Sequence, residues 1–168
     1  GFKNIYVLNG GLKKWVLERR KTTNTLTKRK LSTFNFAINK SWLTKTNEIK
    51  KNLYNNKYKI IDARNNDRFN GISKEPRKGL RSGHIPNSKN IFWRNVIDKN
   101  ETLMPKNKIK SLFNKKNIKN KYIILTCGSG ISACVLCLSL KHVLDINSSV
   151  YDGSWSEWGS NKKLPIEK

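Results

Sequence analysis

The chain has 168 residues, enough for one well-buried domain with extra segments but too few for two domains of ordinary size. Its 35 basic residues outnumber 11 acidic ones, giving a formal net charge of +24, yet the lysines are spread among asparagines and accompany no nucleic-acid-binding motif. We therefore expect no specific nucleic-acid partner, and, because no apolar run reaches the ~18 residues of a membrane span, no membrane partner.

Two short segments near opposite ends of the chain share one pattern. Residues 7–15 and 150–158 both read Val, apolar, Asn or Asp, Gly, small, apolar, two polar residues, Trp. In each, the pattern predicts a short strand, a Gly turn and a helix that buries its Trp. The second copy closes a domain, so the first copy should close another one that is largely absent. The alternative is coincidence, because a Gly-Gly turn followed by Trp is not rare.

These signals divide the chain into four parts. Residues 1–16 are expected to be the terminal remnant of a first domain, and the start lacks both an initiator Met and a signal-peptide pattern. Residues 17–36 are polar, basic and Thr-rich, which is typical of a linker. Residues 37–160 then form one complete domain, and residues 161–168 form a tail.

Within 37–160, short apolar runs alternate with helical patterns. Ser41 is a plausible cap for a short helix that includes Trp42, Leu43, Ile49 and Leu53. Strands are expected at 59–62, 90–92, 122–126 and 149–151, and helices at 106–116 and 132–144. This alternation predicts an α/β fold in which a parallel sheet is flanked by helices on both faces.

The segment from Thr126 to Ala133 lies between a buried strand and an apolar helix, where open α/β sheets bind ligands. Its glycines, Gly128 and Gly130, let the backbone curl so that several N–H groups point inward, and the next helix adds the positive end of its dipole. Such a cradle stabilises an anion and favours the thiolate of Cys127 as a nucleophile. A buried, inert Cys beside a Gly turn is the alternative interpretation.

Two chemistries use a Cys at the base of such a loop. Cysteine phosphatases need an Arg six positions after the Cys, and here that position is Ala133. The remaining chemistry is attack on sulfane sulfur, which leaves a persulfide whose terminal sulfur is held by backbone N–H groups.

The chain has three cysteines, all within eleven residues: Cys127, Cys134 and Cys137. An odd count on one strand-to-helix unit is not a disulfide framework and suits a reducing compartment, so we expect a cytoplasmic location, with the mitochondrion as the alternative. Cys134 and Cys137 form a C-x-x-C spacing inside an apolar helix with no second pair, which predicts core packing and no metal site.

Several motifs, in order along residues 37–160, resemble the C-terminal, catalytic domain of the 3-mercaptopyruvate sulfurtransferases of the rhodanese superfamily. They are Asp62-Ala63-Arg64, Arg68-Phe69-Asn70-Gly71, Glu75-Pro76-Arg77, residues 79–86, residues 127–134 and residues 151–159. The resemblance implies a rhodanese-like fold, and it identifies the segment ending at Trp15 with the close of the family's N-terminal rhodanese domain.

The resemblance also implies an activity and a site. The Cys127 thiolate would take sulfur from 3-mercaptopyruvate, or from thiosulfate, and pass it to a thiol or cyanide, with no cofactor. Gly128 and Ser129 match the mercaptopyruvate type, and Ser129 would assist proton handling. Arg68 and Arg77 match the arginines that bind the small anionic donor, with surface ion pairing as the alternative. The persulfide would lie in a loop that includes Gly128, Gly130, Ile131 and Ser132.

The resemblance leaves one gap. In the family, a His and an acidic residue that act with the loop Ser come from the N-terminal domain, which this chain lacks. His84 is not that His and is expected to be a structural turn residue. The alternative function is therefore a catalytically impaired fragment of a two-domain enzyme, whose missing N-terminal rhodanese domain would be a partner.

Overall fold

The computed structural model describes residues 4–33, 35–37, 39–116 and 122–168. Five parallel strands form one sheet in the order β1-β5-β4-β2-β3. The strands are β1 (Leu43–Thr44), β2 (Tyr58–Asp62), β3 (Lys89–Asn90), β4 (Tyr122–Thr126) and β5 (Ser148–Tyr151). The expected parallel sheet is confirmed.

Strand β4 lies at the centre of the sheet, between β5 and β2. Because a central strand of a parallel sheet is buried on both faces, its sequence is a continuous apolar run, Ile123-Ile124-Leu125. Asp62 at the end of β2 is in register with Thr126 at the end of β4. The residues that follow these two strands therefore lie at the same edge of the sheet.

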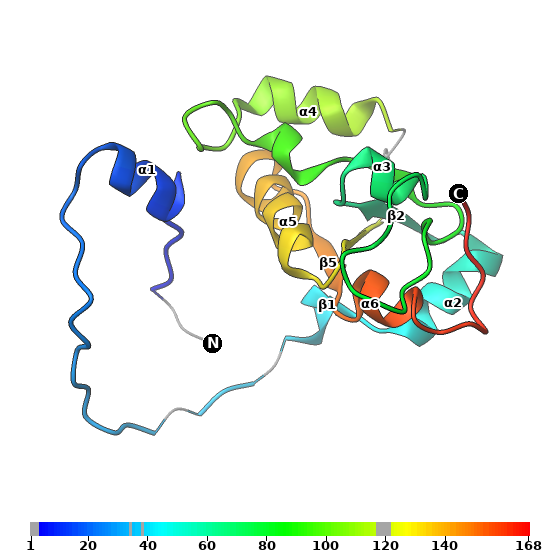
Figure 1. The fold of residues 1–168 in the computed structure, drawn as a ribbon, viewed down its shortest axis with the longest axis horizontal. Helices are drawn as coiled ribbons and strands as arrows, with labels where there is room; N and C mark the ends of the chain where they lie inside the picture. The colour runs from blue at the N-terminus through cyan, green and yellow to red at the C-terminus, as the bar shows by residue number, and fades with distance from the viewer. Residues whose placement is uncertain (1–3, 34, 38, 117–121) are drawn as a thin grey trace.

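Helices cover both faces of the sheet, as expected (Figure 1). On one face, α4 (Lys106–Asn114), α5 (Ile131–Leu144) and the 3₁₀ helix η2 (Trp93–Val96) enclose a core that includes Ile109, Phe113, Leu136 and Leu140. On the other face, α2 (Thr46–Asn55) and α6 (Ser154–Trp158) contribute Ile49, Trp155 and Trp158. The short helix α3 (Asn66–Phe69) follows β2.

The helix expected to include Trp42 and Leu43 begins later. Trp42 ends the 3₁₀ helix η1 (Lys40–Trp42), and Leu43 begins β1, which pairs with β5. Helix α2 begins at Thr46, and the carboxylate of Glu48 accepts the backbone N–H of Lys45 at 2.8 Å. Pairing with a distant strand therefore overrides the local helical pattern here. The strand expected at 90–92 is also displaced, to Lys89–Asn90.

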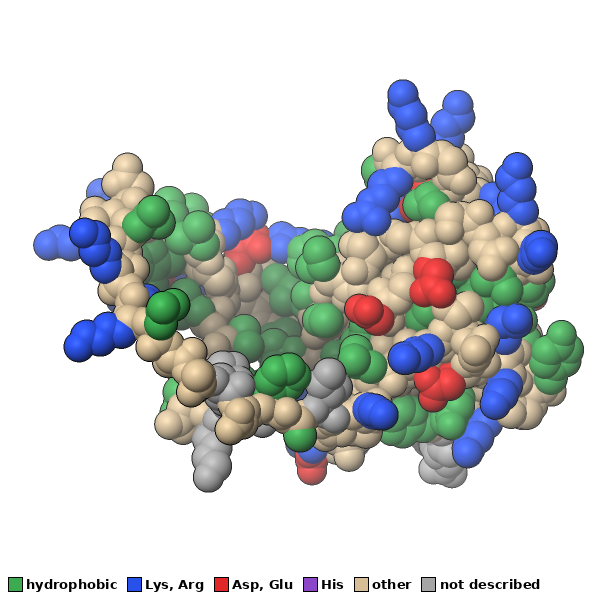
Figure 2. Space-filling model, turned by 90° about the horizontal axis from the view of Figure 1, so that it is seen from below, with side chains coloured by type: hydrophobic (Ala, Val, Ile, Leu, Met, Phe, Trp, Pro, Cys, Tyr) green, Lys and Arg blue, Asp and Glu red, His purple; other side chains and the backbone are tan. Residues whose placement is uncertain are grey.

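The N-terminal segment is only partly as expected. Helix α1 (Gly11–Leu17) follows the Gly turn, but residues 4–8 form no strand and Trp15 is only half-buried. A strand needs neighbours, and no strand of the described residues lies beside this segment. Contacts with the domain are polar: Lys13 pairs with Glu101 at 2.5 Å, and Asn9 accepts the N–H of Leu103 at 3.1 Å. Apolar side chains gather in the hollow between this N-terminal segment and the domain (Figure 2).

Residues 18–33 and 35–37 are irregular and exposed, and they run as an extended segment that loops away from the domain between α1 and β1 (Figure 1). Residues 161–168 instead pack back onto it, through an antiparallel bridge between His84 and Glu167 and through Leu164 in the second core. None of the helices in the described ranges has the length and apolar composition needed to cross a bilayer.

Candidate active site

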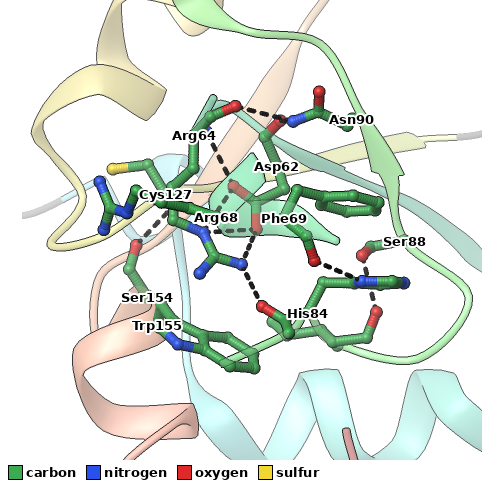
Figure 3. Close-up of polar contacts among 12 residues, drawn as sticks. Asp62, Arg64, Arg68, Phe69, His84, Ser88, Asn90, Cys127, Ser154 and Trp155 are labelled. Carbon is green, nitrogen blue, oxygen red and sulfur yellow. Dashed lines mark hydrogen bonds and ion pairs between the residues drawn. The ribbon is translucent and has the colours of Figure 1, made fainter. Parts of the chain in front are cut away.

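Cys127 follows the central strand β4 directly and precedes α5, the placement expected from the sequence. Its side chain is buried, yet it lines a cavity of about 350 Å³ at the carboxyl edge of the sheet. Arg68 lies beside it (Figure 3). Cys127 is thus almost fully shielded from bulk solvent, and it lines a cavity large enough to hold a small molecule.

Helix α6 binds the polar backbone groups at the start of the 127–132 loop. The N–H of Trp155 donates to the carbonyl of Cys127, and the N–H of Ser156 donates to the carbonyl of Gly128, both at 2.9 Å. The hydroxyl of Ser154 accepts the N–H of Cys127 at 3.2 Å. The carbonyl groups of the first two loop residues therefore point toward α6.

This arrangement sets the direction of the next N–H groups. In a trans peptide the carbonyl and the N–H point in opposite directions, so the N–H groups of Gly128 and Ser129 point away from α6. Within the described part of the chain, none of the five N–H groups from Gly128 to Ser132 has a hydrogen-bond partner. Together with the N-terminus of the fourteen-residue helix α5, they form a cradle suited to an anion.

Gly130 is the loop position that requires glycine for its conformation. Its φ of 85° lies in the left-handed region, and it caps α5. A Cβ atom there would also approach the carbonyl oxygen of Asp152 to 3.3 Å. The glycine therefore permits both the sharp turn into α5 and the close approach to the segment after β5.

The structure brings most of the expected site residues around one cavity. Its lining includes Cys127, Gly128, Ser129, Ile131, Ser132, Arg68 and Arg77. Gly130 lies instead on the lining of a neighbouring cavity of about 540 Å³, which also contacts Ser129 and Ile131. The 127–132 loop thus forms a wall between two cavities.

Arg68 reaches the cavity from α3. Its Nε and Nη2 atoms donate to the carboxylate of Glu75 at 3.1 and 2.6 Å. These bonds raise the pKa of the Arg68 guanidinium, against the opposing effect of its partial burial. The Nη1 group makes no hydrogen bond within the described residues, so Arg68 keeps donors for an anion.

A buried network of charged side chains lies behind Arg68, and no role was predicted for it from the sequence. Arg64, only 2% exposed, bonds Asp62 through Nε and Nη2 and bonds Glu75 at 2.9 Å through Nη1. Its guanidinium also lies 4.4 Å from the centre of the Trp155 ring. The signal in the sequence was a pair of charged residues at the end of a buried strand, in Asp62-Ala63-Arg64.

Arg77 reaches the same cavity from the segment after Glu75. Its Nη1 atom donates to the hydroxyl of Ser156 at 2.7 Å, and that hydroxyl donates to the carbonyl of Gly128 at 2.6 Å. Arg77 is exposed and, among the described side chains, forms no ion pair. The two arginines therefore differ: Arg68 forms an ion pair with the buried carboxylate of Glu75, whereas Arg77 bonds the hydroxyl of Ser156.

The other cysteines differ from one another. Cys137 is buried in the first core, as expected, but Cys134 is exposed, so its expected core position is wrong. Cys134 lies in the first turn of α5, where its thiol donates to the carbonyl of Gly130 at 3.4 Å and faces the neighbouring cavity. Burial of part of the side chain raises the pKa of the Cys134 thiol.

Across the described residues, no three His, Cys, Asp or Glu side chains gather to hold a metal ion.

His84 lies away from the cavity. Its ring stacks on Phe69 with 3.8 Å between centres, and its Nδ1 atom is 2.8 Å from the carbonyl oxygen of Phe69. The backbone of His84 forms two hydrogen bonds with Glu167. These contacts are structural, in agreement with the sequence-based interpretation.

Comparison with known proteins gives consistent matches. The model of the rhodanese-like domain family matches residues 45–161. The chain is 36% identical to 3-mercaptopyruvate sulfurtransferase of Escherichia coli K12, over 99% of this chain and 59% of that protein. It is 34% identical to the mitochondrial thiosulfate/3-mercaptopyruvate sulfurtransferase 1 of Arabidopsis thaliana, over 99% of this chain and 50% of that protein. The chain therefore spans about half the length of the curated relatives it matches.

Solved structures agree on the fold. A structure of EanB in complex with ergothioneine superposes with a TM-score of 0.89 at 20% identity, covering 99% of this chain and 42% of that one. Tum1 of Saccharomyces cerevisiae superposes with a TM-score of 0.66 at 27% identity, covering 76% of this chain and 47% of that one.

Proposed function

The chain belongs to the rhodanese-like family, and from that premise we propose that it is a sulfurtransferase whose nucleophile is Cys127. The observation that carries the proposal is the geometry around this thiol. It lies at the base of five backbone N–H groups that have no hydrogen-bond partner among the described residues, and Arg68 and Arg77 line the same cavity. The N–H groups and the arginines both favour chemistry in which negative charge develops on sulfur.

The first half-reaction would load one sulfur atom. The Cys127 thiolate attacks the sulfur of 3-mercaptopyruvate, an S–S bond forms, and the C–S bond breaks with its electron pair moving to carbon. The resulting enolate of pyruvate takes up a proton, for which Ser129 at the cavity wall is the proposed relay. The loop N–H groups would stabilise the persulfide that remains.

The two arginines support a donor that carries a carboxylate. Guanidinium groups bind planar anions through forked pairs of hydrogen bonds, and Arg68 and Arg77 both line the cavity. The loop residues after Cys127 are Gly128 and Ser129, with no basic side chain. We therefore propose 3-mercaptopyruvate as the preferred donor and thiosulfate, from which sulfite would leave, as the weaker one.

The second half-reaction would return the enzyme to its starting state. A thiol or cyanide attacks the outer sulfur of the persulfide, the S–S bond breaks, and Cys127 leaves as the thiolate. No cofactor enters either step. All three cysteines are free thiols, which suits the reducing conditions of the cytoplasm or the mitochondrion, where we place the protein.

A second candidate function is that of an impaired half of a two-domain sulfurtransferase. The observation that favours it is coverage, because the chain spans about half the length of its curated relatives. On this proposal a further rhodanese domain, supplied separately, would complete the site.

Intact-mass measurement after incubation with 3-mercaptopyruvate tests both candidates. Under the main proposal the chain gains the mass of one sulfur atom, Cys127→Ser gains none, and Cys134→Ser gains as much as the unchanged protein. Folded protein that gains no sulfur from mercaptopyruvate or thiosulfate would favour the impaired half. Equal loading from both donors would contradict the donor preference.

A further inference from the structure

Ser156 joins three parts of the site. It lies in α6, is half-buried, and lines the cavity with Cys127. Its hydroxyl donates to the carbonyl of Gly128 at 2.6 Å and accepts from Nη1 of Arg77 at 2.7 Å. One hydroxyl can do both, since it has one donor hydrogen and two acceptor lone pairs.

On the loop side, Ser156 fixes a peptide plane. The carbonyl of Gly128 receives two hydrogen bonds from Ser156, one from its N–H at 2.9 Å and one from its hydroxyl. Because the peptide is planar and trans, these bonds also fix the opposite direction of the Ser129 N–H. The hydroxyl therefore reinforces an orientation that the backbone bond already sets.

Ser156 also holds Arg77 in place. In the part of the chain that the structure describes, the hydroxyl of Ser156 is the one hydrogen-bond partner of the Arg77 guanidinium. Arg68, by contrast, is held by Glu75 through two bonds. An exposed arginine without a partner samples many rotamers, so loss of this bond would disperse the positive charge at the cavity mouth.

We propose that Ser156 is a positioning residue that gives the site its preference for donors bearing a carboxylate. It holds Arg77 at a fixed place relative to the Cys127 loop, so that the guanidinium meets a carboxylate while the thiol meets the reacting atom. The inference rests on the proposed function in one respect, the assignment of Arg77 to the donor's carboxylate.

Alkylation of Cys127 tests the proposal without sulfur chemistry. Iodoacetate carries a carboxylate and iodoacetamide does not, and peptide mass mapping separates labelling of Cys127 from that of Cys134. We expect Ser156→Ala to lower the ratio of the iodoacetate rate to the iodoacetamide rate roughly 10-fold, the usual effect of losing one hydrogen bond to a charged group. Ser156→Thr, which keeps the hydroxyl, should retain the ratio.

Two further variants make the result specific. Ser160 lies just beyond α6, and its exposed hydroxyl donates to the carbonyl of Glu157. Ser160→Ala removes this hydroxyl and should leave the ratio of the two alkylation rates unchanged. Arg77→Met should lower the ratio as much as Ser156→Ala, and the double variant should lower it no further. An unchanged ratio in Ser156→Ala, an equal fall in both rates, or additive effects in the double variant would each overturn the proposal.

Steady-state kinetics provide the second readout. Ser156→Ala should raise KM for 3-mercaptopyruvate roughly 10-fold and leave kcat within about 2-fold, because it weakens placement of the donor without touching the thiol. An unchanged KM would overturn the proposal. If the unchanged protein prefers iodoacetate through Ser156 but accepts no sulfur, the proposed function fails while the role of Ser156 stands.

Discussion

The guanidinium of Arg68 lies against the backbone of Gly128, where an added Cβ atom would stand 3.0 Å from Nη2 of Arg68. Gly128 lies outside the left-handed region of backbone conformation, so this approach, and not φ, is what favours glycine. The arginine cannot withdraw freely, because Glu75 holds it through two hydrogen bonds.

Gly128→Ala should therefore displace Arg68 and impair donor binding. We expect kcat/KM for 3-mercaptopyruvate to fall roughly 10-fold, the scale of a small misplacement in a positioned site. The thermal unfolding midpoint should change little, since the new methyl group faces the cavity. Full activity in this variant would show that Arg68 moves aside without consequence.

Glu75→Gln should destabilise the fold as well as the site. Its carboxylate is buried and accepts hydrogen bonds from both Arg64 and Arg68, so the neutral amide would leave buried positive charge unbalanced. Loss of one partner from a buried ion pair costs about 3 kcal/mol, and we expect that decrease in the free energy of unfolding in urea. Glu101→Gln is the matched control, because Glu101 also pairs with two basic residues, Arg94 and Lys13, whose side chains are 38% and 65% exposed against 1% and 25% for Arg64 and Arg68. Equal losses in the two variants would contradict the proposed importance of burial.

The ion pairs of Glu101 also make the stability of the protein depend on pH. Hydrogen bonds from Arg94, and then from Lys13, lower the pKa of Glu101 from 4.5 to about 2. The folded protein thus favours the carboxylate, so its contribution to stability is full above pH 4.5 and is lost as the pH falls through about 2. In urea titrations the difference between the unchanged protein and Glu101→Gln should shrink over this interval. Parallel curves would argue against the ion pair in solution.

Tyr151 gives the opposite prediction at high pH. Burial raises the pKa of its phenol from 10.0 to about 12. The folded protein therefore keeps the proton more tightly than the unfolded chain, and this contribution to stability, full below pH 10.0, is lost as the pH rises through about 12. Tyr151→Phe should lose less stability over that range. When tyrosine ionisation of the folded variant is followed by ultraviolet absorbance, the step at the highest pH should be missing.

Local sequence predicted the parts of the fold whose signals are local. Strand β4 contains the continuous apolar run Ile123-Ile124-Leu125, strand β2 contains the buried pair Ile60-Ile61, and the glycine-containing loop between β4 and α5 has a pattern of its own. Cys127 could be placed from these signals because its position depends on neighbours in sequence. The same holds for α4 and α5, whose ends differ by only one or two residues from the expected ones.

The remainder depends on contacts between distant segments. Leu43 forms a strand because β5 lies beside it, and residues 4–8 form none because the described residues provide no neighbour. Glu75 lies on an irregular segment, so its contact with two arginines could not be inferred from periodicity. The exposure of Cys134 likewise depends on how α5 rotates over the sheet, which its nearly uniform apolar sequence leaves unspecified.

The hydrogen bonds between α6 and the Cys127 loop also affect the order in which the domain folds. Strand β5 pairs with the central strand β4 only after α5 has crossed between them, as Ile123 pairs with Ser148. Only after this pairing can Trp155 and Ser156, which follow β5, reach the carbonyls of Cys127 and Gly128. During refolding, we therefore expect near-native secondary structure to precede a reactive thiol, so that the nucleophile is formed among the last features of the domain.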